Sequence, residues 1–143
     1  MRIPLQVYEY AGGLRVVAQF ILRSKELNLF MPIQAIVDTG SPVTMIGNLD
    51  LARARLSKIQ LRKLIGENKP VNIGGGKVIT RILEEANIKF GGDLEAEIPV
   101  QFPISGEERN NQPSLLGVDF MLKTKSKLVF DPFKKEAYFE IGD

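Results

Sequence analysis

Runs of apolar residues separated by polar turns fill the first part of the chain. Residues 14–22 are rich in β-branched and aromatic side chains and follow a glycine pair at 12–13, so they are predicted to form a hairpin with residues 3–10. After a polar turn, residues 29–37 return as another strand that becomes almost wholly apolar just before Asp38. This strand is therefore predicted to be buried on both faces at its end.

Helical spacing replaces the strand pattern between residues 48 and 65. Apolar side chains recur there at intervals of three and four residues, at Leu49, Ala52, Leu56 and Ile59. The number of helices stays open, because Ser57 and Gln60 have the spacing of a capping box that would separate one helix from a second before Gly66 stops it.

Strand patterns resume after the helical segment. Residues 71–83 have two β-prone arms around Gly74, Gly75 and Gly76, which predicts a hairpin with a mobile glycine tip. The other predicted elements are strands at 86–90, 97–104, 127–130 and 136–141, a surface loop at 105–114 and a short amphipathic helix at 118–125. With 44% hydrophobic and 25% charged residues, this pattern indicates one mainly β domain that spans residues 1–143.

Two absences narrow the chemistry. The sequence contains neither cysteine nor histidine, so Ser/His/Asp and Cys/His nucleophilic systems cannot be built within the chain, and disulfides are impossible. Zinc sites also lose their usual donors, and we predict neither a metal nor a cofactor. Carboxylates remain the most available groups for proton exchange near neutral or acid pH, since lysines would need strong desolvation. An enzyme built from this chain is expected to use carboxylate chemistry.

The charge balance gives no reason to expect nucleic acid or a membrane as a partner. Nineteen basic residues stand against seventeen acidic ones, for a net charge of +2. Basic side chains crowd residues 53–63, but no aromatic residue accompanies them for base stacking, so a solvated face is the favoured interpretation. Asp119 is predicted to stabilise the first turn of its helix. The apolar runs are too short for a membrane span and the start lacks a secretory signal pattern, so we predict a soluble, cytoplasmic protein.

The candidate chemistry lies where an apolar strand end leads directly into Asp38, Thr39, Gly40 and Ser41. The strand would fix the acid, Gly40 would let the backbone turn so that its N–H approaches the carboxylate, and Ser41 would donate to an outer carboxylate oxygen. Thr39 would anchor the loop through a further hydrogen bond. The alternative is an ordinary turn, because Asp and Gly favour turns for conformational reasons.

The order of these parts resembles the retropepsins, the single-domain aspartic peptidases typified by retroviral proteases, from about residue 14 to residue 141. The matching segments are the active-site loop at Val37, Asp38, Thr39, Gly40 and Ser41, the substrate-covering flap at Ile73, Gly74, Gly75 and Gly76, and the hydrophobic-hydrophobic-Gly element at Leu115, Leu116 and Gly117 that supports the active site. The resemblance implies a closed or partly open β-barrel with one or two short helices and one flap hairpin. It also implies that Asp38 is the catalytic residue.

The implied activity is that of an aspartic endopeptidase acting as a homodimer on a peptide or unfolded protein substrate. The chain has only one Asp-Thr-Gly, whereas the chemistry needs two carboxylates that share a proton, so a second copy must supply the other. In this mechanism the Asp38 pair activates a water, Thr39 braces the loop across the axis, and the glycine tip closes over an extended peptide. Two close like charges resist ionising together, which favours activity at acidic pH. The apolar ends at 3–10 and 137–141 are predicted to interleave as edge strands.

Two positions depart from the viral pattern. Pro42 stands where viral members usually carry an acidic residue, and Val118 stands where they carry an arginine, so the contact made by that pair is not expected here. The helical segment 48–65 also looks longer than its viral counterparts. The alternative function is a non-catalytic dimerisation or peptide-binding module of the same fold. Retention of Asp, Thr, Gly and Ser together argues against it, because paired charge at a symmetry axis is costly to bury.

Overall fold

The computed structural model describes residues 1–54, 69–73, 76–106 and 112–142, and most of these residues lie in strands. The strands are β1 (Arg2–Tyr10), β2 (Gly13–Ser24), β3 (Leu29–Val37), β4 (Thr44–Met45), β5 (Lys69–Ile73), β6 (Gly76–Lys89), β7 (Glu95–Gly106), β8 (Ser114–Leu116), β9 (Ser126–Asp131) and β10 (Glu136–Ile141). The described part also contains two short helices, α1 (Asn48–Ala54) and α3 (Val118–Thr124). The predicted mainly β class is confirmed.

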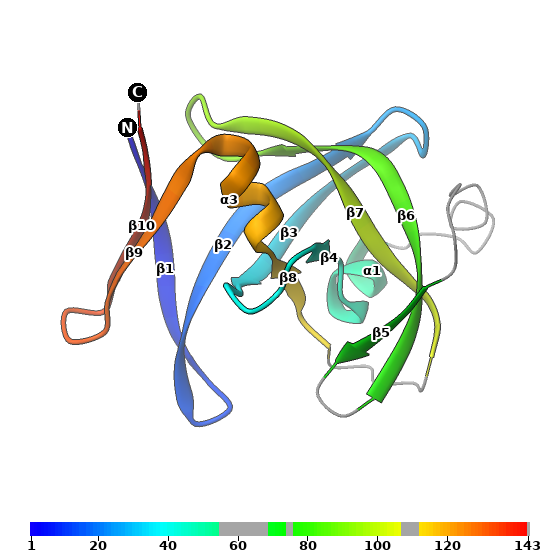
Figure 1. Cartoon of the computed structure of the whole chain (residues 1–143), viewed down its shortest axis with the longest axis horizontal. Coiled ribbons are helices and arrows are strands. Elements are labelled where there is room, and N and C mark those ends of the chain that lie inside the picture. The colour runs from blue at the N-terminus through cyan, green and yellow to red at the C-terminus, as the bar shows by residue number, and fades with distance from the viewer. Residues whose placement is uncertain (55–68, 74–75, 107–111, 143) are drawn as a thin grey trace.

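Six of the strands form a closed ring. The order around it is β2, β3, β8, β4, β7 and β6, and it closes because β6 pairs with β2 as well as with β7. Only the end of β2 takes part in this closure, since its beginning pairs with β1. β1 also pairs with β10, and β10 pairs with β9. These three strands extend together from one side of the barrel (Figure 1).

The core of the barrel is apolar, and an aromatic cluster joins it to α3. Phe90 lies at the centre of this cluster, with ring centroids 5.5 Å from Phe20, 5.4 Å from Phe120 and 6.0 Å from Phe139. Phe120 and Phe139 are fully buried. Because Phe120 belongs to α3 and Phe139 to β10, the cluster holds the helix and the three-stranded extension on the same core.

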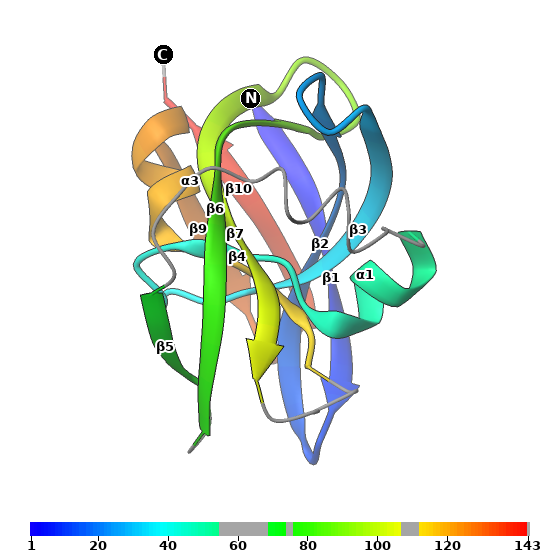
Figure 2. The same ribbon diagram turned by 90° about the vertical axis from the view of Figure 1, so that its right-hand side faces the viewer.

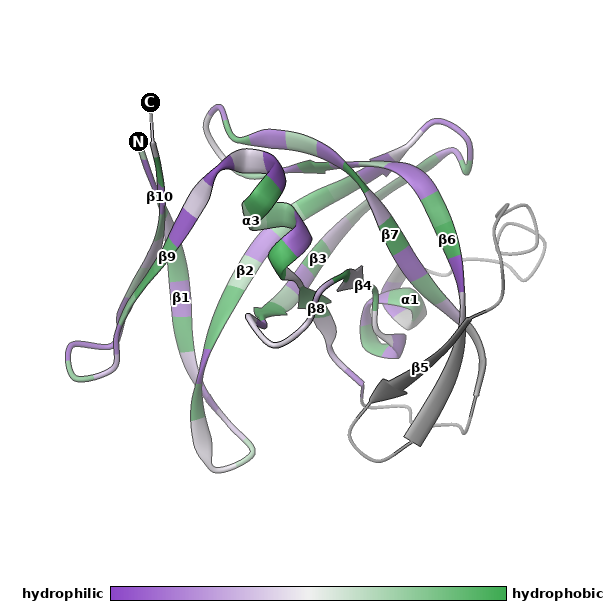
Figure 3. Ribbon diagram, viewed as in Figure 1, coloured by the Kyte–Doolittle hydropathy of each residue, from purple (hydrophilic) through white to green (hydrophobic). Residues whose placement is uncertain are grey.

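Buried and exposed positions alternate along β3, a strand whose sequence is mostly apolar (Figure 3). Met31, Ile33 and Ala35 are buried, while the residues between them face outward. Toward its end, Ile36 is half-buried and Val37 is buried. The expected burial on both faces is therefore only partial.

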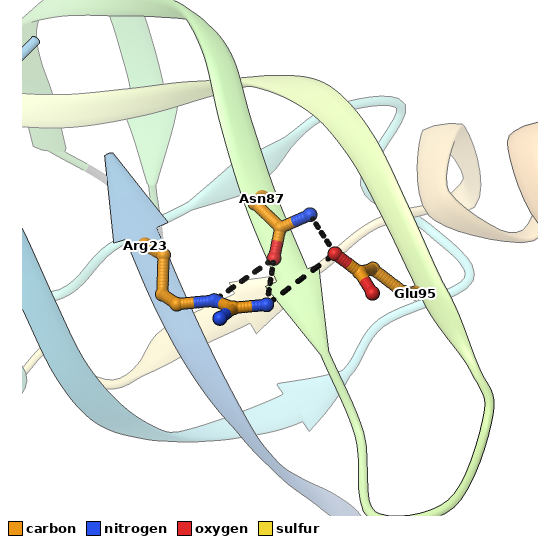
Figure 4. A network of polar contacts seen from close by, with 3 residues as sticks. All are labelled: Arg23, Asn87 and Glu95. Carbon is orange, nitrogen blue, oxygen red and sulfur yellow. Dashed lines mark hydrogen bonds and ion pairs between the residues drawn. The ribbon is translucent and has the colours of Figure 1, made fainter. Parts of the chain in front are cut away.

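A polar cluster joins β2, β6 and β7 at the closure of the barrel, where Arg23 lies opposite Asn87 (Figure 4). The guanidinium of Arg23 donates to Asn87 Oδ1 at 3.2 and 3.3 Å and to Glu95 Oε1 at 3.3 Å. Asn87 Nδ2 donates to the same Glu95 oxygen at 2.7 Å. The Arg23 and Glu95 side chains are 40% and 46% exposed, so the ion pair adds at most about 1 kcal/mol to stability. The cluster fixes the register of the closure rather than supplying its energy.

Several element boundaries differ from the prediction. The second hairpin arm and the predicted strand at 86–90 are one strand, β6, interrupted by a register shift between Leu83 and Ala86 where Glu84 and Glu85 face solvent. The predicted loop at 105–114 is shorter, because β7 continues to Gly106 and β8 begins at Ser114. The short strands β4 and β8 were not predicted as strands.

The helical prediction at 48–65 is confirmed over α1, and its remainder lies outside the described residues. Among the described helices, none has the length and apolar character that crossing a membrane requires.

Candidate active site

Asp38 directly follows β3 in a turn, and hydrogen bonds from backbone groups fix the position of this turn. Its own N–H donates to the carbonyl of Leu116 at 3.0 Å, and its carbonyl accepts from the N–H of Ser41 at 3.1 Å. The N–H of Gly40 donates to Asp38 Oδ1 at 2.9 Å. The Asp38 side chain is half-buried and Thr39 and Gly40 are exposed, so the carboxylate stands at an open surface in a fixed orientation.

The approach of the Gly40 N–H to the carboxylate agrees with the sequence expectation, whereas the expected role of Ser41 is wrong. The Ser41 hydroxyl donates to the carbonyl of Val43 at 2.7 Å instead of to the Asp38 carboxylate. A hydroxyl has one proton to donate, so this bond stabilises the loop itself.

The hydrophobic-hydrophobic-Gly element lies directly beneath this loop. β8 pairs in parallel with β3, with Ile36 opposite Leu115 and Val37 opposite Leu116. The next residue, Gly117, packs so closely against the loop that a Cβ there would lie 2.4 Å from the Val43 carbonyl oxygen. The element therefore needs glycine at this position for a steric reason.

The start of α3 is bonded to the loop by a network that the sequence did not reveal. The Asp119 carboxylate accepts from the N–H of Thr44 at 3.0 Å, from the Thr44 hydroxyl at 2.8 Å and from the N–H of Phe120 at 2.8 Å. The Thr44 hydroxyl in turn accepts from the N–H of Gly117 at 3.0 Å. The N–H of Val118 donates to the Ser41 carbonyl at 2.9 Å. The predicted role of Asp119 at the first turn is thus present, but its main partner is 75 residues away in sequence.

We expect Asp119→Ala to lower the free energy of unfolding by about 2–4 kcal/mol, because three donors lose a charged acceptor in a partly buried place. Urea denaturation measures this change. Asp119→Asn should lose less stability than Asp119→Ala. Its amide oxygen can still accept from the Thr44 hydroxyl and the Phe120 N–H, although its NH₂ group then faces the Thr44 N–H. Asp93→Ala, at an exposed turn, is the matched control. A loss for Asp119→Ala no larger than that control would contradict the assigned role.

Another carboxylate, Asp50, is buried and positions β8 from the side of α1. It is 1% exposed, accepts a hydrogen bond from the Ser114 hydroxyl and pairs with Arg53. The same hydroxyl accepts from the N–H of Gly47 at 2.8 Å. Asp50 thus helps to set the strand that supports Asp38, a role with no local sequence signal.

The predicted glycine-tipped hairpin is formed by β5 and β6, in which Val71 lies opposite Val78 and Ile73 opposite Gly76. Gly74 and Gly75 lie outside the described residues. The hairpin projects on the same side of the barrel as the loop between β3 and β4 (Figure 2). In the described part of the chain, no group of three or more Asp and Glu side chains is placed to hold a metal ion.

Comparison with solved structures shows that this fold is similar to that of retropepsin-like proteases. A retropepsin-like aspartic protease from Rickettsia conorii superposes with a TM-score of 0.59 at 16% identity, over 97% of this chain and 89% of that one. The EIAV protease, solved with an inhibitor, superposes with a TM-score of 0.53 at 17% identity, over 86% of this chain and 100% of that one. No protein-family model and no curated protein sequence matches the chain. The chain therefore has a retropepsin-like fold.

Proposed function

We propose that the protein is an aspartic endopeptidase that works as a homodimer, with Asp38 of each subunit forming the catalytic pair. The observation that carries this proposal is the Asp38 turn. A retropepsin-like barrel presents one half-exposed carboxylate, oriented by the Gly40 N–H and fixed by the backbone bond to Leu116. One chain supplies one such acid, and the reaction requires two.

In the proposed reaction, one Asp38 carboxylate removes a proton from a water while the other, protonated, donates its proton to the scissile carbonyl oxygen. The water oxygen bonds to the carbonyl carbon and forms a tetrahedral diol. The Asp38 that took the water proton then gives it to the amide nitrogen, while the other Asp38 removes a proton from one diol hydroxyl. The C–N bond breaks to give a carboxylic acid and an amine, and the pair again holds one shared proton. Rigid backbone bonds around Asp38 suit this chemistry, because little reorganisation accompanies each proton transfer.

The proposed substrate is an extended peptide or unfolded protein held between the Asp38 loops and the β5–β6 hairpins, which act as flaps. Thr39 is exposed beside Asp38, in a position suited to bracing the loop of the other subunit. The cytoplasm is the proposed location.

The test is peptide cleavage measured as a function of protein concentration. Purified protein is incubated with a library of unstructured peptides from acid to neutral pH. Because the active form is the dimer, a tenfold dilution below the dissociation constant should lower the rate per subunit about tenfold. Sedimentation on the same samples reports the dimer fraction. A rate per subunit that stays constant while the dimer dissociates would contradict the shared site.

A dimer that cleaves nothing at any pH would favour the alternative of a non-catalytic dimerisation or peptide-binding module. Pro42 and Val118 are consistent with that alternative, because they replace the viral charged pair near the catalytic loop. Fluorescence anisotropy with the same peptides would then separate peptide binding from dimerisation alone.

A further inference from the structure

A groove of about 620 Å³ lies between the β1–β2 hairpin and α1 (Figure 2). Its lining includes Ile36 of β3, and Asp38 follows two residues later in the chain. An extended chain spans at most about 3.6 Å per residue, so the Cα atoms of Ile36 and Asp38 lie within about 7 Å of each other. A peptide bound at Asp38 can therefore reach this groove with the side chain of a residue close to the scissile bond.

The hairpin wall of the groove carries aromatic and cationic side chains on one face. Tyr8 lies opposite Arg15 and Tyr10 opposite Gly13 in the antiparallel register, so these residues share a face of the hairpin. Glu9 also borders the groove, but it alternates with the two tyrosines and its side chain belongs to the other face. The charge on the face that carries the tyrosines is therefore that of Arg15.

Arg15 has hydrogen-bond donors left for a partner. Its exposed guanidinium donates through Nη1 to the Leu14 carbonyl at 3.1 Å, and among the described residues no carboxylate oxygen lies within 4 Å of it. The group lies close to Gly13, where a Cβ would be only 3.2 Å from Nη1, so no side chain covers it there. A guanidinium has five N–H donors in a planar fork that matches a carboxylate. Within the described part of the chain, Arg15 is thus a cation that lacks an anionic partner.

A second guanidinium borders the same groove from α1. Arg53 is 61% exposed and pairs with Asp50, which is 1% exposed and also accepts from the Ser114 hydroxyl. Burial keeps the Asp50 carboxylate out of reach of a ligand, while its bond to Arg53 fixes the guanidinium. Arg53 therefore adds oriented donors from the other wall of the groove.

The groove also has an apolar part. Val17 is buried, Ile36 and Pro113 are half-buried, and Leu49 is exposed, and all four line it. Such a surface packs well against methylene groups, and its low local dielectric strengthens hydrogen bonds to a charged group. The groove thus suits a side chain with an apolar stem and an anionic end.

We propose that this groove binds an acidic side chain of the substrate peptide, whose carboxylate accepts hydrogen bonds from Arg15 and Arg53. The inference rests on the proposed function and deepens it, because it gives the peptidase a preference for an acidic residue near the scissile bond. Glutamate suits the groove better than aspartate, since it places one more methylene group on the apolar lining. Arg15 is then the specificity-determining residue.

The test compares peptides that differ in a single charge. Peptides blocked at both ends carry Glu, Gln or Lys at one position at a time, on either side of the cleavage site in an otherwise uncharged sequence. At one position, the wild-type protein is expected to cleave the Glu peptide with a kcat/KM about tenfold higher than the Gln peptide, because Gln has nearly the same shape but no charge. Arg15→Gln should lower this ratio at least about threefold, and Arg15→Glu should make Lys preferred over Glu.

Lys25→Glu is the matched control, because it makes the same change of charge just beyond the other end of β2, about 30 Å from Arg15 along the strand. This variant should keep the wild-type preference, which separates a local contact from an effect of net charge. Arg15 and Lys25 are both exposed, so all three variants should fold, and urea denaturation checks this.

Binding measured without cleavage separates this inference from the peptidase proposal. Fluorescence anisotropy of the labelled peptides with the Asp38→Asn protein should show the same preference for Glu, about tenfold in the dissociation constant. Equal affinity and equal cleavage for Glu and Gln, or a Glu preference that Arg15→Glu leaves unchanged, would overturn acid recognition and leave the peptidase proposal standing. Binding that prefers Glu and depends on Arg15, in a protein that never cleaves these peptides, supports acid recognition by the groove and overturns the peptidase.

Discussion

Replacing Asp38 with asparagine is expected to abolish peptide cleavage, with a rate at least about 1,000-fold below that of the wild-type protein. The substitution retains the size of the side chain and an oxygen that can accept from the Gly40 N–H, so the turn should survive. It removes both the base that takes a proton from water and the acid that protonates the carbonyl, because each subunit carries the change. The release of new amino termini from an unstructured peptide, followed at acidic and neutral pH, measures the effect.

Mixing experiments sharpen this prediction. Excess Asp38→Asn protein added to a fixed amount of wild type should suppress wild-type cleavage, since each mixed dimer holds only one carboxylate of the pair. Asp93 is an exposed carboxylate in the turn between β6 and β7, so Asp93→Asn is the control. This variant should retain activity and should not inhibit the wild-type protein when the two are mixed. Cleavage that persists in the Asp38→Asn protein alone would overturn the mechanism.

The strands of the barrel could be predicted because their burial follows local sequence patterns. β3 was predicted from its run of apolar and β-prone residues, although only Gln34 among its outward positions is polar, so composition rather than alternation carried the signal. β4 and β8 were missed because strands of two and three residues are too short to show a period. β6 appeared as two strands because Glu84 and Glu85 interrupt its pattern, although the strand continues through an irregularity there.

In the candidate site too, contacts within a short stretch of sequence could be predicted, and contacts between distant residues could not. The contact between Gly40 and Asp38 spans two residues, and turn chemistry within the motif predicted it. The contacts of Asp119 with Thr44 and of Asp50 with Ser114 join residues 75 and 64 positions apart, and nothing in either local sequence specifies the partner. The groove between the β1–β2 hairpin and α1 likewise depends on tertiary packing, which propensity does not determine.

Gly117→Ala is expected to lower the free energy of unfolding by about 3 kcal/mol and to abolish cleavage. The backbone of Gly117 has φ −90° and ψ −179°, which any residue can adopt, so the cause is packing and not conformation. An added Cβ would lie 2.4 Å from the Val43 carbonyl oxygen, 2.6 Å from its carbon and 2.8 Å from the Ser41 carbonyl oxygen. These are backbone atoms, and no side-chain rotation can relieve the overlap.

Relief of this overlap requires the loop and the start of α3 to move apart. That movement would weaken the bonds from Val118 to Ser41 and from Gly117 to Thr44, which fix the turn carrying Asp38. Gly91→Ala is the matched control, since a Cβ there meets no atom within 4 Å, and it should change stability by no more than about 0.5 kcal/mol. Urea denaturation of both variants gives the comparison. If Gly117→Ala were as stable as Gly91→Ala, the close packing of Gly117 against the Ser41 and Val43 backbone would not contribute to stability as proposed.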